Sequence, residues 1–363
     1  MPLDEPSWWY DDRPSIWPLI LSPLSNLYGT LALRRLARDK PYRSRLAVVC
    51  VGNFTAGGTG KTPFAITIAR LLHEMGERPA FLTRGYGGRR RGPYWIDPAH
   101  DTSADVGDEP LLLANEAPTM LARDRRAGAI AIETSGRAIS AIIMDDGLQN
   151  PALAKDLSIA IIDAVRGIGN GHVIPAGPLR APLEAQLGLV DAILVNTPPN
   201  APATSARTTG SANGATLTKT LRRDFPGPVL TSRAVASGDI AWLEGKRVVA
   251  FSGIANPDRF FSTLEQAGAV IADRITFKDH HAFSEADAKR LLGSATAHAA
   301  TLVTTEKDNA RLSGHGGKRA ALADAAKTIA IGLSFADRDA IRLRELLQSA
   351  VATGGYRQRY RQT

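Results

Sequence analysis

Short apolar runs, separated by segments of helical periodicity and by loops, fill the chain from residue 46 onward. Runs of four to six apolar residues are typical of buried strands, and a helical pattern follows the first of them at residues 63–75. Strands that alternate with helices predict a mainly parallel sheet covered by helices on both faces, which is an α/β fold. The strands expected in the first half of the chain lie at residues 46–51, 80–83, 141–144, 158–162 and 192–195.

A second, smaller α/β unit is predicted after residue 240. Residues 247–251 form a further apolar run, which leads into a helix that ends near Gly268, and residues 301–305 form a later strand. Residues 197–216 are rich in Pro, Ala, Ser, Thr, Gly and Asn without periodicity, which predicts a loop or linker. The predicted organisation is an N-terminal segment at 1–45, a first domain at 46–196, a linker at 197–240, a second domain at 241–350 and a basic tail at 351–363.

The N-terminal segment carries an apolar stripe that leads into a basic cluster. Ser22 and Pro23 are predicted as the N-cap and first position of a helix, on which apolar side chains recur at helical spacing from residue 24 to residue 31. Residues 34–45 then hold six Arg and Lys side chains and one Asp, a net charge of +5. The pattern indicates an amphipathic helix at an anionic membrane interface; the alternative is a surface helix packed on its own domain.

Composition restricts the class of protein and its partners. The 363 residues carry 44 Lys and Arg against 36 Asp and Glu, a net charge of +8 that favours nucleic acid, phosphorylated ligands or anionic membranes as partners. A single cysteine, Cys50, excludes an intramolecular disulfide framework and fits a reducing compartment. The sequence has no run of 18 apolar residues, so we expect no conventional transmembrane helix, and its acidic first dozen residues do not fit a secretory signal peptide.

A glycine-rich loop between the first predicted strand and its helix carries the strongest chemical signal. In such a loop successive N–H groups point at phosphate oxygens, and the helix N-terminus adds its positive end. Lys61 would reach the β- and γ-phosphates of a nucleotide, and the Thr62 hydroxyl would hold Mg²⁺. The consensus G-x-x-x-x-G-K-S/T is met except at its first position, and the alternative is a glycine-rich turn without this chemistry. The expected nucleotide-binding residues are Thr55, Ala56, Gly57, Gly58, Thr59, Gly60, Lys61 and Thr62.

Two aspartates end a later apolar strand, as a metal-positioning element of such a nucleotide site should. Asp145 is expected to contact Mg²⁺, directly or through water, and Asp146 to support it. Either carboxylate could instead cap the turn that follows at residues 147–149. Together with Lys61 and Thr62, the pair predicts a site for a nucleoside triphosphate and Mg²⁺.

Seven phrases, in order along the chain, resemble the tetraacyldisaccharide 4′-kinase (lipid A 4′-kinase) family from residue 46 to about residue 310. They are Val51-Gly52-Asn53 with Gly57 to Pro63, Thr83 to Gly88, Val106 to Pro110, Asp145 to Gln149, Pro175 to Arg180, Asp279-His280-His281, and Thr305 to Asp308. The resemblance implies two α/β/α domains, the first a P-loop NTPase domain. It also implies transfer of a phosphoryl group from ATP to the 4′-hydroxyl of a tetraacyldisaccharide 1-phosphate, giving lipid IVA. The family is peripheral on the cytoplasmic side of the inner membrane of Gram-negative bacteria.

Roles for further residues follow from the same resemblance. Asp108 is similar to the family's proposed base, since a carboxylate can accept the proton of a sugar hydroxyl and aim its oxygen; helix capping is the alternative. His280 resembles the partner of that base, although the adjacent His280 and His281 could both be structural. Substrate contacts are expected, with solvated loop charges as the alternative for the arginines, from Asn53, Arg84, Glu109, Arg123 and Arg125.

Two details and two rival functions stay open at this level. Either Arg123 or Arg125 could correspond to the family's substrate-side arginine, and Ala181 stands where many members carry an acid, the next acid being Glu184. One rival is a P-loop ATPase or GTPase of the partitioning or metalloprotein-maturation type. The other is a nucleic-acid-binding ATPase, which the low aromatic content of 6% disfavours. We expect no nucleic-acid partner and favour a monomer.

Overall fold

The structure is a computed structural model that describes residues 5–10, 15–37, 40–197, 214–254, 256–314 and 316–360. The chain divides into two compact units. The first unit comprises Met1–Leu82, Asp124–Arg233 and Phe335–Thr363, and the second comprises Thr83–Arg123 and Ala234–Ser334. Each unit is therefore assembled from separate stretches of sequence.

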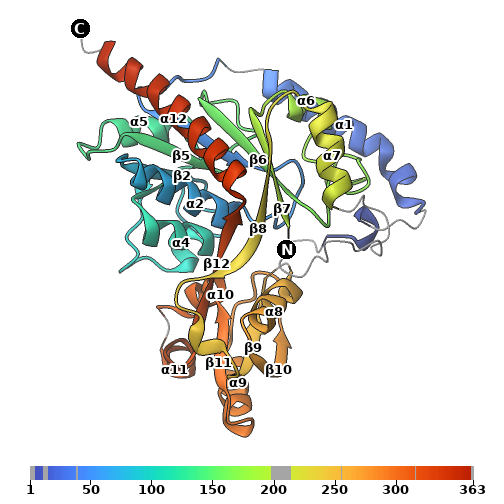
Figure 1. Cartoon of the computed structure of the whole chain (residues 1–363), viewed down its shortest axis with the longest axis vertical. Helices are drawn as coiled ribbons and strands as arrows, with labels where there is room; N and C mark the ends of the chain where they lie inside the picture. Colours follow the sequence, from blue (N-terminus) through green and yellow to red (C-terminus); the bar gives the residue numbers. More distant parts are fainter. Residues whose placement is uncertain are drawn as a thin grey trace. The chain divides into compact units, whose positions relative to one another are not determined.

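The first unit is built on a parallel sheet with the strand order β8-β7-β6-β1-β5-β2 (Figure 1). Its strands are β1 (Ala47–Gly52), β2 (Pro79–Thr83), β5 (Ala141–Asp145), β6 (Leu157–Asp163), β7 (Ala192–Thr197) and β8 (Val229–Ser237). Its helices are a 3-10 turn at Ser7–Trp9, α1 (Trp17–Ala37), α2 (Lys61–Glu74), α5 (Arg125–Glu133), α6 (Leu183–Leu187), α7 (Gly214–Asp224) and α12 (Asp337–Tyr360).

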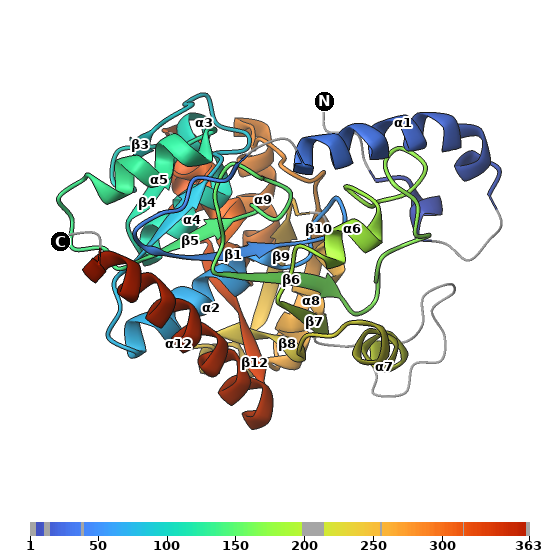
Figure 2. The same cartoon turned by 90° about the horizontal axis from the view of Figure 1, so that it is seen from above.

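The central strands of this sheet are buried along their whole length, which explains their continuous apolar sequences. Helices α2 and α12 cover one face of the sheet and α5 covers the other (Figure 2). Strands β1 and β5 pair in parallel, with Val51 opposite Asp145. The loop after β1 and the acidic residues after β5 therefore emerge at the same edge of the sheet.

Helix α1 begins earlier than the sequence suggested, and this corrects the prediction of an N-cap at Ser22. The helix starts at Trp17 and contains Pro23 in its interior. Proline has no N–H to donate to the carbonyl four residues before it, here Leu19. The Ser22 hydroxyl donates to that carbonyl instead, at 2.9 Å. The serine thus supplies the hydrogen bond that the proline lacks, and the helix continues through it.

The second unit contains its own parallel sheet, in the order β10-β9-β11-β12, and a short antiparallel pair, β3-β4. Its strands are β3 (Tyr94–Trp95), β4 (Thr119–Leu121), β9 (Arg247–Ser252), β10 (Val270–Thr276), β11 (Thr301–Thr305) and β12 (Lys327–Phe335). Its helices are α3 (Ser103–Val106), α4 (Asp108–Glu116), a 3-10 turn at Ala241–Leu243, α8 (Pro257–Gln266), α9 (Glu285–Ala297), α10 (Glu306–Leu312) and α11 (Gly317–Ala325).

Alternate residues of β9 face opposite sides of the second sheet and build a core on each. Val248 packs with Phe260 and Leu264 of α8, whereas Phe251 packs with Leu291 of α9. This two-sided burial is the α/β/α arrangement expected for the unit.

The predicted α/β fold is confirmed, and the predicted strands agree with the observed ones to within one or two residues. The observed units are divided differently from the predicted domains, because residues 83–123 cluster with the second unit, where α4 packs on α10. The predicted linker contains α7 and the whole of β8, and the predicted basic tail continues α12 as far as Tyr360. Residues 198–213, as well as Arg38 and Asp39 of the basic cluster, lie outside the described residues.

None of the helices in the described parts of the chain is long and apolar enough to cross a membrane.

We predict that Phe260→Ala lowers the free energy of unfolding by about 3–5 kcal/mol, because the ring is 1% exposed and its loss leaves a cavity under α8. Urea unfolding followed by circular dichroism measures the change. The matched control is Val270→Ala, since that side chain is 49% exposed on β10 of the same unit; we expect a loss below about 1 kcal/mol. Equal losses in the two variants would contradict the assignment of this core.

Candidate functional site

The first cluster of candidate residues surrounds the loop between β1 and α2. Gly57 and Gly60 have φ angles of 90° and 93°, a region that side chains with a Cβ rarely adopt. The start of the loop is fixed by an isolated antiparallel bridge between Thr55 and Leu179. In this bridge the Ala56 N–H donates to the Pro178 carbonyl at 2.8 Å, and the Arg180 N–H donates to the Phe54 carbonyl at 2.9 Å. The loop therefore has a fixed entry and a glycine-dependent curve that ends at the N-terminus of α2.

Two buried polar atoms beside this loop have no hydrogen-bond partner among the described residues. They are the Thr59 hydroxyl and the side-chain oxygen of Asn53. Buried polar atoms are almost always satisfied in a native protein, so an unsatisfied pair at a loop of this type is typical of a position where a ligand or water binds. Asn53 itself is fully buried, and its side-chain nitrogen donates to the Gly57 carbonyl at 3.4 Å.

Asp146 lies between two cations at the same edge of the sheet. Arg180 donates to both of its carboxylate oxygens, at 2.6 and 3.1 Å, and the Lys61 ammonium lies 3.9 Å away. Burial would raise the pKa of Asp146, but the charges of Lys61 and Arg180 outweigh it and hold the pKa well below its ordinary value. Arg180 also donates to the Thr55 carbonyl at 3.0 Å, so one guanidinium joins the loop to the acid.

The partner role of Arg180 was not predicted. The sequence contained the signal, because the phrase Pro175 to Arg180 is one of those that resemble the kinase family, but a phrase does not reveal which carboxylate an arginine meets. Glu184, considered as a substitute for the missing acid at Ala181, is exposed in the first turn of α6.

The residues proposed for Mg²⁺ are oxygen donors of the kind that this ion prefers. Thr62 is the second residue of α2, and Asp145 is the last residue of β5, with side chains that are almost fully buried. No group of three or more His, Cys, Asp or Glu side chains in the described residues could hold a metal by itself.

Arg125 and Arg123 lie in different environments. Arg125 is buried at 3% exposure, and its guanidinium donates to the Asp145 carbonyl at 3.1 Å within the first unit. Arg123 and Arg84 are exposed and belong to the second unit. Of the two alternatives left open by the sequence, Arg123 is the one with an accessible side chain.

An N-terminal segment, whose position the sequence did not predict, lies against the same loop. Glu5 forms an ion pair of 2.8 Å with Arg166, and a Cβ placed on Gly57 would lie 1.7 Å from a Glu5 carboxylate oxygen. Trp9 holds the segment in place, since its indole N–H donates to the Pro175 carbonyl at 3.2 Å. A carboxylate at this place lies beside the backbone that would bind phosphate.

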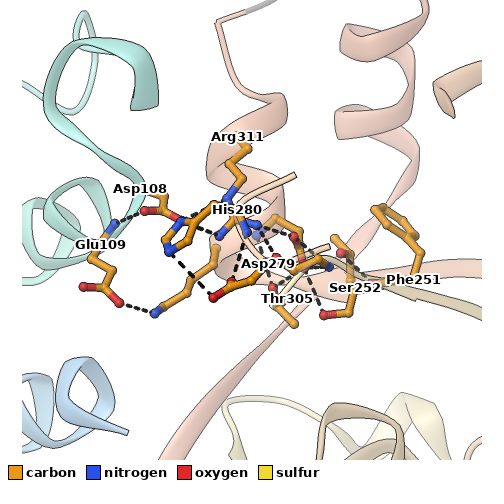
Figure 3. A network of polar contacts seen from close by, with 12 residues as sticks. Asp108, Glu109, Phe251, Ser252, Asp279, His280, Thr305 and Arg311 are labelled. Carbon is orange, nitrogen blue, oxygen red and sulfur yellow. Dashed lines mark hydrogen bonds and ion pairs between the residues drawn. The ribbon is translucent and has the colours of Figure 1, made fainter. Parts of the chain in front are cut away.

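The second cluster lies in the second unit and centres on Asp108 (Figure 3). Asp108 is the first residue of α4, after Gly107, and is 6% exposed. One carboxylate oxygen accepts the Glu109 N–H at 3.0 Å, and the other accepts Arg311 Nε at 2.9 Å and lies 3.3 Å from His280 Nδ1. Gly107 occupies the N-cap position of α4, and Asp108 bonds an N–H of the first turn, so this side chain combines a helix-terminal contact with its contacts to Arg311 and His280.

Asp108 and His280 shift each other's protonation in opposite directions. Burial would raise the pKa of Asp108, but the hydrogen bond with His280 and the charges of Arg311 and Lys307 hold it well below its ordinary value. The hydrogen bond with Asp108 raises the pKa of His280 and outweighs the effect of burial. A proton that reaches this pair therefore resides on the imidazole.

His280 and His281 point to different surroundings, as expected for adjacent residues. His280 has a φ angle of 57°, an uncommon backbone conformation for a residue with a side chain, and its N–H donates to the Gly253 carbonyl at 3.1 Å. His281 stacks on Phe277 with ring centres 4.7 Å apart and bonds Asp287 at 3.0 Å. His281 is thus part of the packing around α9, while His280 is the histidine at Asp108.

Helix α10 supplies two cations to the same cluster, and neither was predicted. Lys307 forms an ion pair with Glu109, and Arg311 forms one with Asp108. The phrase Thr305 to Asp308 contained the signal for Lys307, but Arg311 lies beyond that phrase. Because the partners are about 200 residues apart in the chain, sequence spacing alone could not have paired them.

Known proteins resemble this chain over most of its length. A family model described as LpxK, tetraacyldisaccharide-1-P 4′-kinase, matches residues 17–351. The tetraacyldisaccharide 4′-kinase of Rhodopseudomonas palustris (strain BisB18) is 44% identical over 339 residues, which cover 93% of this chain and 94% of that protein. The one from Methylobacterium sp. (strain 4-46) is 46% identical over 339 residues, covering 93% and 96%.

The fold is also that of a solved structure, the "apo" form of LpxK from Aquifex aeolicus in complex with ATP. The TM-score is 0.68 at 22% sequence identity, and the match covers 92% of this chain and 99% of that one. Family model, relatives and fold agree over nearly the whole length. The chain belongs to the tetraacyldisaccharide-1-phosphate 4′-kinase family.

Proposed function

We propose that this chain transfers the γ-phosphoryl group of ATP to the 4′-hydroxyl of a tetraacyldisaccharide 1-phosphate, giving lipid IVA. The observation that carries the proposal is the buried Asp108, ionised and hydrogen-bonded to His280, in a chain that also holds a phosphate-binding loop. A partitioning or maturation ATPase needs a nucleotide site but no group for a sugar acceptor. A kinase for a sugar hydroxyl also needs a group that orients the acceptor and receives its proton.

The first cluster provides the donor side of the reaction. The backbone of residues 55–60 and the N-terminus of α2 would bind the phosphates, with Lys61 on the β- and γ-phosphates. Asp145, Asp146 and Thr62 would hold Mg²⁺, which when bound neutralises charge on the phosphates. Arg180 keeps Asp146 ionised and joins it to the loop, so that its carboxylate can interact with Lys61 or with Mg²⁺.

The second cluster provides the acceptor side. The 4′-oxygen forms its bond to the γ-phosphorus as the bond to the β-phosphate oxygen breaks, and ADP leaves. The hydroxyl proton passes to the Asp108–His280 pair, where the raised pKa of His280 places it on the imidazole. The exposed Arg84 and Arg123, together with Asn53 and Glu109, are proposed to contact the phosphorylated substrate, and Arg125 to act through the Asp145 backbone that it bonds.

We predict that the folded protein, with ATP, Mg²⁺ and tetraacyldisaccharide 1-phosphate in detergent, forms a product phosphorylated at the 4′ position. Lys61→Ala should lower the rate on the order of 100-fold or more, because it removes a cation from the transferred group. Asp108→Asn should lower kcat by about 10²–10⁴-fold, since a neutral amide removes the charge that raises the pKa of His280 and stabilises the proton on its imidazole. Radiolabel transfer and mass spectrometry of the lipid measure both.

Matched controls are Lys246→Ala and Asp324→Asn, both at exposed positions of the second unit, and they should keep wild-type rates. The proposal fails if folded wild-type protein gives no 4′-phosphorylated lipid. Nucleotide hydrolysis that is independent of lipid would point to the ATPase class instead.

Helix α1 supports a peripheral membrane location for this activity. It packs on the protein through small residues, as the Ser25 hydroxyl donates to the Val173 carbonyl at 2.7 Å and Gly29 faces Pro182. Its large apolar side chains face outward at 39–74% exposure, which is the reverse of a helix packed on its own domain. The exposed residues of α1 are Trp17, Leu19, Ile20, Leu24, Leu27, Tyr28, Leu31 and Leu33, and Ile16, just before the helix, is exposed as well.

An outward apolar surface that continues into Arg34 and Arg35 fits the interface of an anionic bilayer, where the acyl chains of the substrate also lie. We propose that the protein acts at the cytoplasmic face of the inner membrane of a Gram-negative bacterium. The monomer favoured by the sequence stays a prediction.

We predict that replacing Leu24, Leu27 and Leu31 together by Ser moves the protein from sedimenting vesicles of phosphatidylethanolamine and phosphatidylglycerol to the supernatant. The reason is the loss of three apolar side chains that are more than half exposed. The control is the triple variant of Ile130, Val165 and Ile341 to Ser, which removes exposed apolar residues elsewhere in the first unit. Unchanged vesicle binding of the α1 variant would refute the membrane role of this helix.

A further inference from the structure

We propose that Arg311 is a positioning residue for the Asp108–His280 pair and that Asp308 is its buried anchor. The inference rests on the proposed function, because it takes Asp108 and His280 as the groups that receive the hydroxyl proton. It concerns residues that lie in one unit and whose contacts are all within that unit.

Asp308 is held on every side before it meets Arg311. The residue has no exposed surface, and its oxygens accept from the Thr305 hydroxyl at 2.7 Å, the Ser252 hydroxyl at 3.2 Å and the Gly253 N–H at 3.1 Å. Thr305 in turn is the N-cap of α10 and accepts the Asp308 N–H at 3.1 Å. The carboxylate is therefore fixed by the end of β9 and the start of α10.

Arg311 spans from this anchor to Asp108. One terminal nitrogen donates to Asp308 at 2.8 Å and to the Gly253 carbonyl at 2.7 Å, while Nε and the other terminal nitrogen donate to a single oxygen of Asp108. That second nitrogen also lies 3.4 Å from His280 Nδ1. A planar guanidinium can make all these bonds at once, whereas an ammonium cannot.

A second ion pair between α10 and α4, that of Lys307 with Glu109, lies one helical turn from the pair of Arg311 with Asp108. Lys307 and Arg311 are four residues apart on α10 and so lie on the same face, and their partners Glu109 and Asp108 are consecutive on α4. Two cations of one short helix thus orient the two acids at the start of another. An ion pair with a purely structural role would need no histidine at the Asp108 oxygen that Arg311 bonds. His280 lies 3.3 Å from that oxygen, and its backbone adopts the uncommon left-handed conformation.

Arg311 also sets the protonation of the pair. The charged groups facing Asp108 are His280, Arg311 and Lys307, and those facing His280 are Asp108, Asp279 and Arg311. The positive charge of Arg311 lowers the pKa of Asp108 and lowers that of His280. Removing the charge should therefore raise both pKa values, so that the pair loses its capacity to accept a proton at a higher pH than in the wild type.

We predict that Arg311→Met lowers kcat about 100-fold, as expected for a misplaced acceptor group, and leaves KM for ATP within about threefold. The acid limb of the kcat–pH profile should move to higher pH, because the positive charge of Arg311, which opposes protonation of His280, is lost. Arg311→Lys keeps the charge but not the fork, so its acid limb should stay near that of the wild type and its kcat should fall between the two. Added guanidinium ion should partly restore Arg311→Ala.

The control is Arg319→Met, which removes an arginine from an exposed ion pair with Glu285 in the same unit and should leave both kcat and the pH profile unchanged. Thermal melting and ATP binding report whether each variant is folded. If Arg311→Met does not fold, Arg311→Lys and guanidinium rescue of Arg311→Ala decide the question. An active wild type with an Arg311→Met variant of unchanged acid limb would overturn this inference alone, whereas an inactive folded wild type would overturn the proposed function.

Discussion

The cost of burying a carboxylate is the constraint on which both sites depend. An ionised acid removed from water is stable only with a close cation or several hydrogen bonds. Asp108, whose side chain is 6% exposed, meets this condition through Arg311 and His280. Asp146, whose side chain is 35% exposed and so only partly removed from water, is paired with Lys61 and Arg180. In both cases the side chains that stabilise the negative charge also fix the direction of the carboxylate. The same hydrogen bonds therefore keep the acid ionised and hold it in position.

The parallel sheets decide where these acids can stand. The carboxyl ends of parallel strands emerge on one edge, and the loop after β1 and the acids at the end of β5 are neighbours there because Val51 pairs with Asp145. In the second unit the residues that follow β9 and β11 also meet at one edge of a sheet. Gly253 follows β9, Asp308 lies in the helix after β11, and the Gly253 N–H donates to the Asp308 carboxylate. Each unit thus brings residues distant in sequence to a single edge, and the helices that follow present their N-termini to it.

Sequence patterns predicted what depends on short-range chemistry. The buried strands could be read from their apolar runs, and the glycine-dependent curve between β1 and α2 from its glycines, because these properties belong to consecutive residues. Arg311, Arg180 and Glu5 could not be found in this way. Each acts through a partner from a distant part of the chain, so its role exists only once the sheets have formed. The same reason explains the divided units: residues 83–123 follow β2 in sequence but pack on α10, and no local pattern indicates that choice.

Helix α1 shows how a pattern can be correct while its orientation remains open. The spacing of its leucines predicted an apolar stripe but could not tell whether the stripe faces the protein or the solvent. Ser25 and Gly29 settle the choice, because only small residues allow the helix to approach residues 173–182 closely, and the Ser25 hydroxyl finds a carbonyl there. Ser22 keeps the helix continuous past Pro23 by bonding the Leu19 carbonyl. Small residues thus fix the helix to the protein, and its large apolar side chains point outward and stay exposed to water.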